Sequence, residues 1–231
     1  FLLITLFKFN GFISFILVAI GIGIAQGMQL NHIVDSIENG IGNTLGFLVM
    51  ILGFGAMLGK LVAESGAAQQ ITNGLIKIFG INYTKIAVML TGFIVGITMF
   101  YSVGFVILVP LVFTIAKATG LSLIGVGLPM LASLSVTHGF LPPHPAPSAL
   151  SVMFEADIGK TLIYGILLSI PAILISGPLL THFLPKVEAK PLKEFMTTRV
   201  FKQEELPSLF NSLSTALLPV LLIGFSTLIS L

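Results

Sequence analysis

One stretch decides the fold: LSVTHGFLPPHPAP at residues 134–147 interrupts an apolar part of the sequence. Its four prolines remove backbone hydrogen-bond donors and disfavour helical geometry in the residue before each of them. We therefore expect residues 121–154 to form one broken membrane-crossing helix. Its first half reaches His138, residues 139–147 are non-helical, and a short second half resumes near Ser148. Free backbone groups at membrane depth are tolerated only when they are buried in protein or line a polar cavity, so this break predicts an internal site.

The composition indicates a membrane protein. Of the 231 residues, 55% are apolar and only 9% are charged, against about 25% charged residues in a soluble domain. So little charge excludes a disordered chain, a nucleic-acid binder and almost any soluble enzyme. The sequence contains no cysteine, which excludes disulfides, thiolate metal sites and a cysteine nucleophile. We therefore expect an all-α polytopic membrane protein.

The uncharged intervals predict where the chain crosses the membrane, because a span needs about 20 apolar residues. Complete spans are expected at about residues 9–26, 44–59 (continuing toward Ala63) and 161–184. Loops are expected at residues 31–43 and 64–85, the second with an interfacial amphipathic turn at residues 69–79. Residues 185–211 read as a polar cytoplasmic linker, and residues 212–231 as one further helix. Both ends of the chain fall inside apolar runs, so we expect it to be a piece of a longer protein.

Residues 86–116 are too many for one span and too few for two. Because Lys and Arg accumulate in cytoplasmic loops, their placement discriminates between topologies. A re-entrant hairpin with its tip at residues 98–104 leaves only Lys160 of the eleven cations on the far side. The ten cations that share the cytoplasmic side are Lys8, Lys60, Lys77, Lys85, Lys117, Lys186, Lys190, Lys193, Arg199 and Lys202. A single crossing would split the cations five to six. Two full crossings give the same sidedness as the hairpin, but the length favours the hairpin.

The polar residues at the two interruptions are the candidate binding residues. Ionisable residues inside a membrane are functional candidates by default, and histidine changes charge near neutral pH. Half-helices that begin near Ser102 and Ser148 would aim free N–H groups at an anion. The expected substrate-binding residues are Thr98, Ser102, Gly104, Ser135, Thr137, His138, Gly139, Pro142, Pro143, His144 and Ser148. The alternative is that the hydroxyls, Ser133 above all, bond only to their own helix.

We expect neither a metal nor a cofactor. His138 and His144 are not spaced as two ligands on one helical face, and no carboxylate accompanies them. Glu64, Glu155 and Asp157 fall at the expected membrane edges and are weaker candidates for carrying a proton. An intramembrane hydrolase would need an acidic partner that this interval lacks, so the sequence does not predict an enzyme.

Residues 134–147 closely resemble the signature region of the gluconate permease family, and residues 53–60, 90–96 and 103–111 match its pattern as well. These are bacterial inner-membrane gluconate:proton symporters of the ion transporter superfamily. The resemblance implies two inverted repeats, of which residues 1–184 would be the first and residues 212–231 the truncated opening of the second. The partners implied are a sugar-acid anion, a proton, the lipid bilayer, the C-terminal repeat and a second copy in a homodimer, with no nucleic acid.

One position departs from the family pattern. Many members carry an acidic residue where this sequence has Ser102, so we expect His138 to be the proton-coupling group here, or a different ion to be coupled. The predicted function is proton-coupled import of gluconate or a related sugar acid. The alternative is a sodium- or proton-coupled transporter of another small carboxylate, such as lactate or a citrate-like acid. A structural or signalling subunit would not explain two interrupted elements in one chain.

Overall fold

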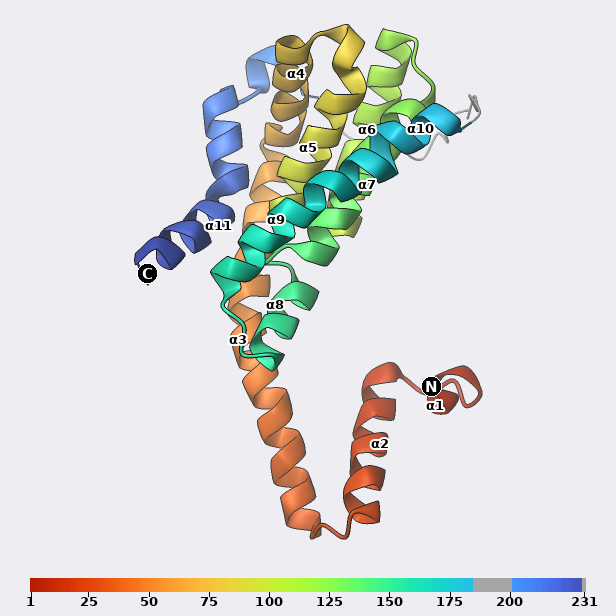
Figure 1. The fold of residues 1–231 in the computed structure, drawn as a ribbon, viewed down its shortest axis with the longest axis vertical. Helices are drawn as coiled ribbons and strands as arrows, with labels where there is room; N and C mark the ends of the chain where they lie inside the picture. Colours follow the sequence, from red (N-terminus) through yellow and green to blue (C-terminus); the bar gives the residue numbers. More distant parts are fainter. Residues whose placement is uncertain (185–200, 230–231) are drawn as a thin grey trace. The chain divides into compact units, whose positions relative to one another are not determined.

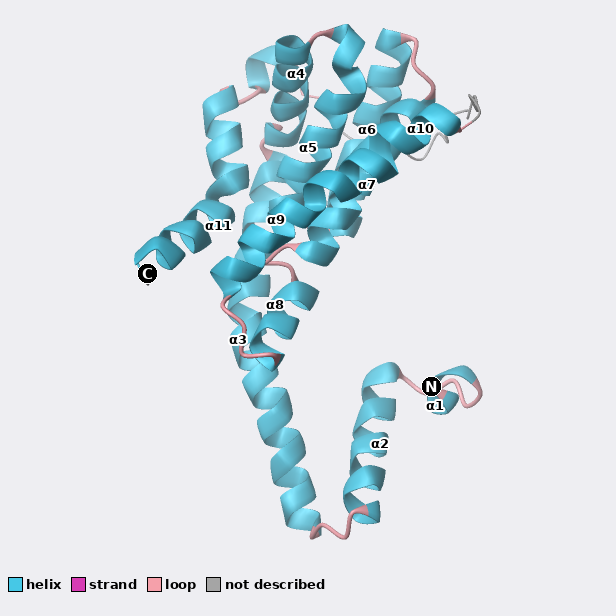
Figure 2. Cartoon of the chain, in the orientation of Figure 1, coloured by secondary structure: helices cyan, strands magenta, loops and turns pink. Residues whose placement is uncertain are grey.

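The computed structural model describes residues 1–184 and 201–229. Every regular element within these two ranges is a helix (Figures 1 and 2). The chain divides into two compact units, Phe1–Met50 and Ile51–Leu231. Five segments of the described chain are long and apolar enough to cross a membrane: Ile81–Thr98, Tyr101–Thr119, Leu123–Met153, Ile158–Phe183 and Leu209–Ile229. The predicted all-helical class is therefore confirmed.

The first unit contains α1 (Leu2–Thr5), α2 (Gly11–Ala25) and the first part of α3 (Leu30–Glu64). α2 agrees with the span predicted at residues 9–26. The Asn10 side chain caps this helix by accepting a hydrogen bond from the Phe12 N–H, which satisfies one of the free donors of its first turn.

The loop predicted at residues 31–43 is wrong, because α3 runs through it without a break. Asp35 and Glu38 make this segment too polar for a membrane span, but polarity does not end a helix. Glycine often ends a helix, but α3 continues through both Gly40 and Gly42. The span predicted at residues 44–59 is therefore the second half of one 35-residue helix.

In the second unit, α4 (Ala67–Phe79) packs against α5 (Thr84–Thr98) and α11 (Leu209–Ile229). The sequence predicted an amphipathic turn at residues 69–79 within a loop at residues 64–85. The structure has a helix there, and only short connections join it to α3 and α5. Ala67, Ala68, Ile71 and Leu75 recur at helical spacing and are buried. That periodicity places one apolar face of α4 against its neighbours instead of leaving it at an interface.

The remaining helices are α6 (Tyr101–Thr119), α7 (Leu123–Phe140), α8 (Pro145–Met153) and α9 (Ile158–Leu174). α9 continues through a π-helical segment, Ile175–Leu179, into α10 (Leu180–Phe183). This continuous run agrees with the span predicted at residues 161–184. α11 begins three residues before the predicted start at residue 212. Most of the predicted linker, residues 185–200, lies outside the described residues.

Glycines show how α5 runs relative to α7. A Cβ atom at Gly92 would collide with the Met130 carbonyl, and one at Gly96 would collide with the Thr137 hydroxyl. The later residue of α5 thus contacts the later residue of α7, so the two helices are parallel. The spacing of four residues between Gly92 and Gly96 is the small-residue pattern that lets membrane helices approach closely.

α6 runs the opposite way. A Cβ atom at Gly104, near the start of α6, would lie 2.8 Å from Leu134 Cδ1, whereas one at Gly127 would lie 3.2 Å from Val112 Cγ1. α6 is therefore antiparallel to α7, and α5 and α6 form an antiparallel hairpin. Its two outer ends lie on the same side of this unit, as both the re-entrant hairpin and two full crossings require. Re-entry from one membrane face stays a prediction.

Candidate functional site

Two interruptions of helical structure meet in the second unit. The first separates α5 from α6 at Met99 and Phe100, whose backbones are extended. The second separates α7 from α8 at residues 141–144. Because α5 and α7 are parallel, both breaks lie at the same end of this helix pair. The His144 Nε2 atom lies 2.6 Å from the Gly96 carbonyl oxygen, which joins the two breaks directly.

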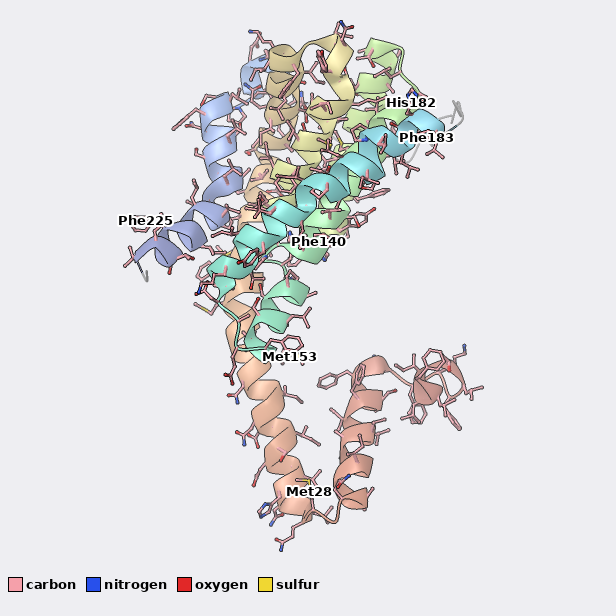
Figure 3. The ribbon with its side chains drawn as sticks, in the orientation of Figure 1. Met28, Phe140, Met153, His182, Phe183 and Phe225 are labelled. Carbon is pink, nitrogen blue, oxygen red and sulfur yellow. The ribbon has the colours of Figure 1, made fainter. Side chains whose placement is uncertain are left out.

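The second break is shorter than the sequence predicted. α7 stays helical through Phe140, and α8 starts at Pro145, three residues before the expected Ser148. Figure 3 labels Phe140 and Met153, the last residues of these two helices. Prolines remove donors, but the N–H groups of a first helical turn have no partner in the helix anyway. Pro145 and Pro147 therefore begin α8 instead of delaying it.

The two histidines of the break form a pair. His144 is buried, with 4% of its surface exposed, and its Nδ1 atom lies 3.1 Å from Nδ1 of His138. The Gly96 carbonyl only accepts hydrogen bonds, so Nε2 of His144 is the donor to it. A neutral His144 then accepts at Nδ1 the hydrogen bond that His138 donates. This assignment leaves Nε2 of His138 as the nitrogen that can take up one proton.

Phe100 completes this arrangement from the hairpin. Its ring centroid lies 6.1 Å from that of His138 and 6.5 Å from that of His144, with steeply inclined planes. Edge contacts of this kind fix the orientation of aromatic rings. Neither Phe100 nor Gly96 was among the predicted residues. Phe100 immediately precedes α6, and its position at the expected hairpin tip is the signal that could have identified it.

Two of the five predicted hydroxyl residues, and Ser133 as well, bond within their own helix. Thr98 donates to the Val95 carbonyl, and Thr137 donates to the Leu134 carbonyl. Ser133 donates to the Pro129 carbonyl, as its alternative reading expected. These donors are occupied, so each hydroxyl retains only its capacity to accept a hydrogen bond from a solute.

Ser148 differs from the other hydroxyls. It is fully buried in the first turns of α8, and its Oγ atom has no hydrogen-bond partner among the described residues. A buried hydroxyl without a partner costs free energy comparable to a lost hydrogen bond. Such an atom is the kind of group that a bound solute can satisfy.

The other predicted residues are spread around the two breaks. Ser135 and Gly139 are exposed near the end of α7, whereas Pro142 is buried and Pro143 partly exposed within the break. Gly104 faces Leu134 and therefore serves the packing of α6 on α7. Ser102 lines a cavity to which neither histidine contributes.

Two cavities adjoin the hairpin tip. One of about 290 Å³ is lined by Thr98, Met99 and Phe100 together with Lys60 and Glu64 of α3. A larger one of about 870 Å³ is lined by Ser102 and Glu64, and also by residues of α4 and α6. These volumes are in the range of cavities that hold small molecules. Lys60 was not among the predicted site residues.

A family profile described as GntP family permease matches residues 1–231. The Gnt-II system L-idonate transporter of Escherichia coli is 50% identical over 220 residues, which cover 95% of this chain and 50% of that protein. The high-affinity gluconate transporter of Escherichia coli is 50% identical over 224 residues, covering 96% of this chain and 51% of the relative.

The gluconate permease of Bacillus subtilis is 44% identical over 230 residues, covering 97% of this chain and 51% of the relative. The chain thus spans about half the length of the curated relatives it matches. No solved structure matches it. The profile match along all 231 residues and these identities show that the chain belongs to the GntP family of permeases.

Proposed function

We propose that the full-length protein imports gluconate or a closely related sugar acid together with a proton across the bacterial inner membrane. The observation that carries this proposal is the pair of helix breaks joined by His144 and Gly96, with His138 beside them. Broken membrane helices of this kind form the substrate and ion sites of secondary transporters. The gluconate and idonate transporters among the relatives support the choice of solute.

Coupling to a proton suits an anionic solute. Moving one negative charge against an inside-negative potential costs about 2.3 kcal/mol per 100 mV. One proton carried with a monovalent sugar acid cancels that cost. Nε2 of His138 is the proposed proton acceptor, because the hydrogen bonds of the pair leave this atom available.

The site offers groups that suit a polyhydroxylated anion. The first turn of α6 begins at the first break, and unpaired N–H groups at a helix N-terminus favour negative charge. In the first turn of α8 only Ala146 keeps such a group, because Pro145 and Pro147 have no N–H. The Ser148 hydroxyl adds a buried polar group without a partner. We assign these groups to the hydroxyls and carboxylate of the solute.

We also propose that residues 1–184 form the first of two inverted repeats, with the α5–α6 hairpin entering the membrane from the cytoplasmic face. The chain's coverage of half the length of its relatives supports this division.

Uptake of labelled gluconate by membrane vesicles that contain the full-length protein tests the function. An inwardly directed proton gradient, with the lower pH outside, is expected to accelerate uptake. An uncoupler is expected to abolish it. His138→Ala should reduce proton-driven uptake at least about a hundredfold, as loss of a proton-transfer group does. His182→Ala is the matched control, because His182 lies in α10 outside the site.

Persistent uptake in the presence of the uncoupler, and in His138→Ala, would contradict proton coupling through His138. Competition with unlabelled acids then identifies the solute. Two relatives of equal identity are named for idonate and gluconate, so these two acids are expected to compete best. Stronger competition by lactate or citrate would replace the sugar-acid assignment.

A further inference from the structure

Lys60 and Glu64 form an ion pair near the C-terminal end of α3, with 3.7 Å between Nζ and Oε1. α3 reaches the hairpin tip at this point, because a Cβ atom at Gly59 would lie only 2.9 Å from the Thr98 carbonyl oxygen. The length of α5, 15 residues or about 22 Å, separates this tip from the end of the hairpin at Thr84. Two charges so far from that end mark a functional position in a membrane protein.

The ion pair also faces open space. Lys60 and Glu64 both line the 290 Å³ cavity, whose opposite wall is the hairpin break at Thr98, Met99 and Phe100. Phe100 in turn contacts both histidines of the other break. The ion pair and the histidine pair therefore lie against the same hairpin break.

Among the described residues that line the two cavities, Lys60 is the cation. Its side chain is 72% exposed and that of Glu64 is 71% exposed, so both charges are accessible to a solute. The separation of 3.7 Å is well beyond the roughly 2.7–2.9 Å of a strong charge-assisted hydrogen bond. A solute carboxylate can therefore replace Glu64 and form a shorter ion pair with Lys60.

We propose that Lys60 binds the carboxylate of the transported acid and that Glu64 is the resting partner which the solute displaces. The inference rests on the proposed function, since it requires an anionic solute. In the empty site, Glu64 supplies the negative charge that lies beside the Lys60 ammonium group. When the solute binds, its carboxylate takes that position and Glu64 is released toward the 870 Å³ cavity, which it also lines.

The test compares Lys60→Gln with Glu64→Gln in the full-length protein, with the KM for gluconate uptake as the measurement. Lys60→Gln is expected to raise KM about tenfold or more, because a charged hydrogen bond to the solute is lost. Glu64→Gln is expected to lower KM about threefold, because the competing carboxylate is removed. If the pair only stabilised the fold, both substitutions would break it and change KM in the same direction, and that result would overturn the proposal.

Two further variants keep the test decisive. Lys60→Arg retains the cation and should keep KM within about threefold of the unaltered protein. Lys77→Gln is the matched control, since Lys77 lies in the last turn of α4, and should leave KM unchanged. If Lys60→Gln does not fold, the direction in which Glu64→Gln changes KM still tests the proposal. A lower KM supports it, and a higher KM contradicts it.

Inhibition by gluconamide separates this inference from the proposed function. The amide has the same hydroxyls but no charge, so the preference for gluconate over gluconamide should fall about tenfold in Lys60→Gln. An unchanged preference would show that Lys60 does not bind the carboxylate, even though gluconate is transported. Failure of the unaltered protein to transport any sugar acid would instead overturn the proposed function, and this inference with it.

Discussion

At the scale of single residues, His144 is fixed by both of its ring nitrogens. Nε2 donates to Gly96 and Nδ1 faces His138, so its tautomer is determined by its partners. We propose on this basis that His144 positions His138, whose Nε2 atom then takes up the proton. The sequence predicted that both histidines bind the substrate and that His138 couples the proton; the structure adds that His144 has the Gly96 carbonyl as a second hydrogen-bond partner.

Replacing His144 tests this positioning role. His144→Ala should lower gluconate uptake by the full-length protein about tenfold or more. The substitution removes the hydrogen bond to the buried Gly96 carbonyl and the contact that orients His138. His144→Gln keeps one donor and one acceptor and should retain more of the activity. Equal loss in the two variants, measured as initial uptake rates across a pH series, would contradict the role of these hydrogen bonds.

Ser148→Ala separates binding from stability. Removing a buried hydroxyl that has no partner is expected to leave the free energy of unfolding unchanged or to raise it by up to about 1 kcal/mol. The KM for uptake should rise about fivefold if the hydroxyl binds the solute. Ser133→Ala, whose hydroxyl already bonds to Pro129, should leave KM unchanged. Thermal denaturation in detergent and uptake kinetics measure the two effects, and unchanged KM in Ser148→Ala would remove Ser148 from the site.

At the scale of elements, the close approach of α5 to α7 depends on two glycines that meet different neighbours. A Cβ atom at Gly92 would meet the backbone of Met130, whereas one at Gly96 would meet the side chain of Thr137. Helix backbone cannot shift without moving the whole of α7, but a side chain can adopt another rotamer. The same substitution should therefore have unequal costs at the two positions.

Gly92→Ala is expected to destabilise the protein by about 2–3 kcal/mol and Gly96→Ala by about 1 kcal/mol, as overpacked sites do. Gly224→Ala is the control, because nothing lies within 4 Å of a Cβ atom there, and alanine is the better helix former. The midpoints of thermal denaturation of the three variants measure the order of their stabilities. A larger loss at Gly96 than at Gly92 would contradict the packing described for α5 and α7.

The helices and the two breaks could largely be predicted from the sequence, whereas loops could not. Prolines and apolar interval lengths act locally, so the interruptions at Met99 and at residues 141–144 were anticipated within a few residues. The loop expected at residues 31–43 is wrong because polar residues were interpreted as a break, whereas α3 is helical throughout that segment. Gly96 and Phe100 were missed because their roles depend on contacts between helices that are distant in the sequence.

At the scale of the whole molecule, the hairpin fixes which charges share a side. α5 is parallel and α6 antiparallel to α7, so the Thr84 end of α5 and the Thr119 end of α6 are neighbours in the second unit. Lys85 donates a hydrogen bond to Thr181 of α10, which places the end of α10 there as well. The charge pattern of the sequence predicts that this end faces the cytoplasm. Lys60, which that pattern counts on the same side, lies instead beside the hairpin tip.

Labelling of single cysteines tests this sidedness, and the chain offers a clean background because it contains no cysteine. A membrane-impermeant maleimide should react with Lys85→Cys and Lys117→Cys only in inverted vesicles. It should react with Lys160→Cys in intact spheroplasts. Opposite accessibility of Lys85→Cys and Lys117→Cys would contradict the hairpin.

The hydrogen bond between His144 and the Gly96 carbonyl has a mechanical consequence. It joins the last turn of α5 to the break between α7 and α8. Any rocking motion that exposes the site alternately to the two sides of the bilayer must carry both pieces as a single block or break this hydrogen bond first. With His138 as the proposed proton carrier, the two rings that bind the proton are also the rings that hold α5 to the break.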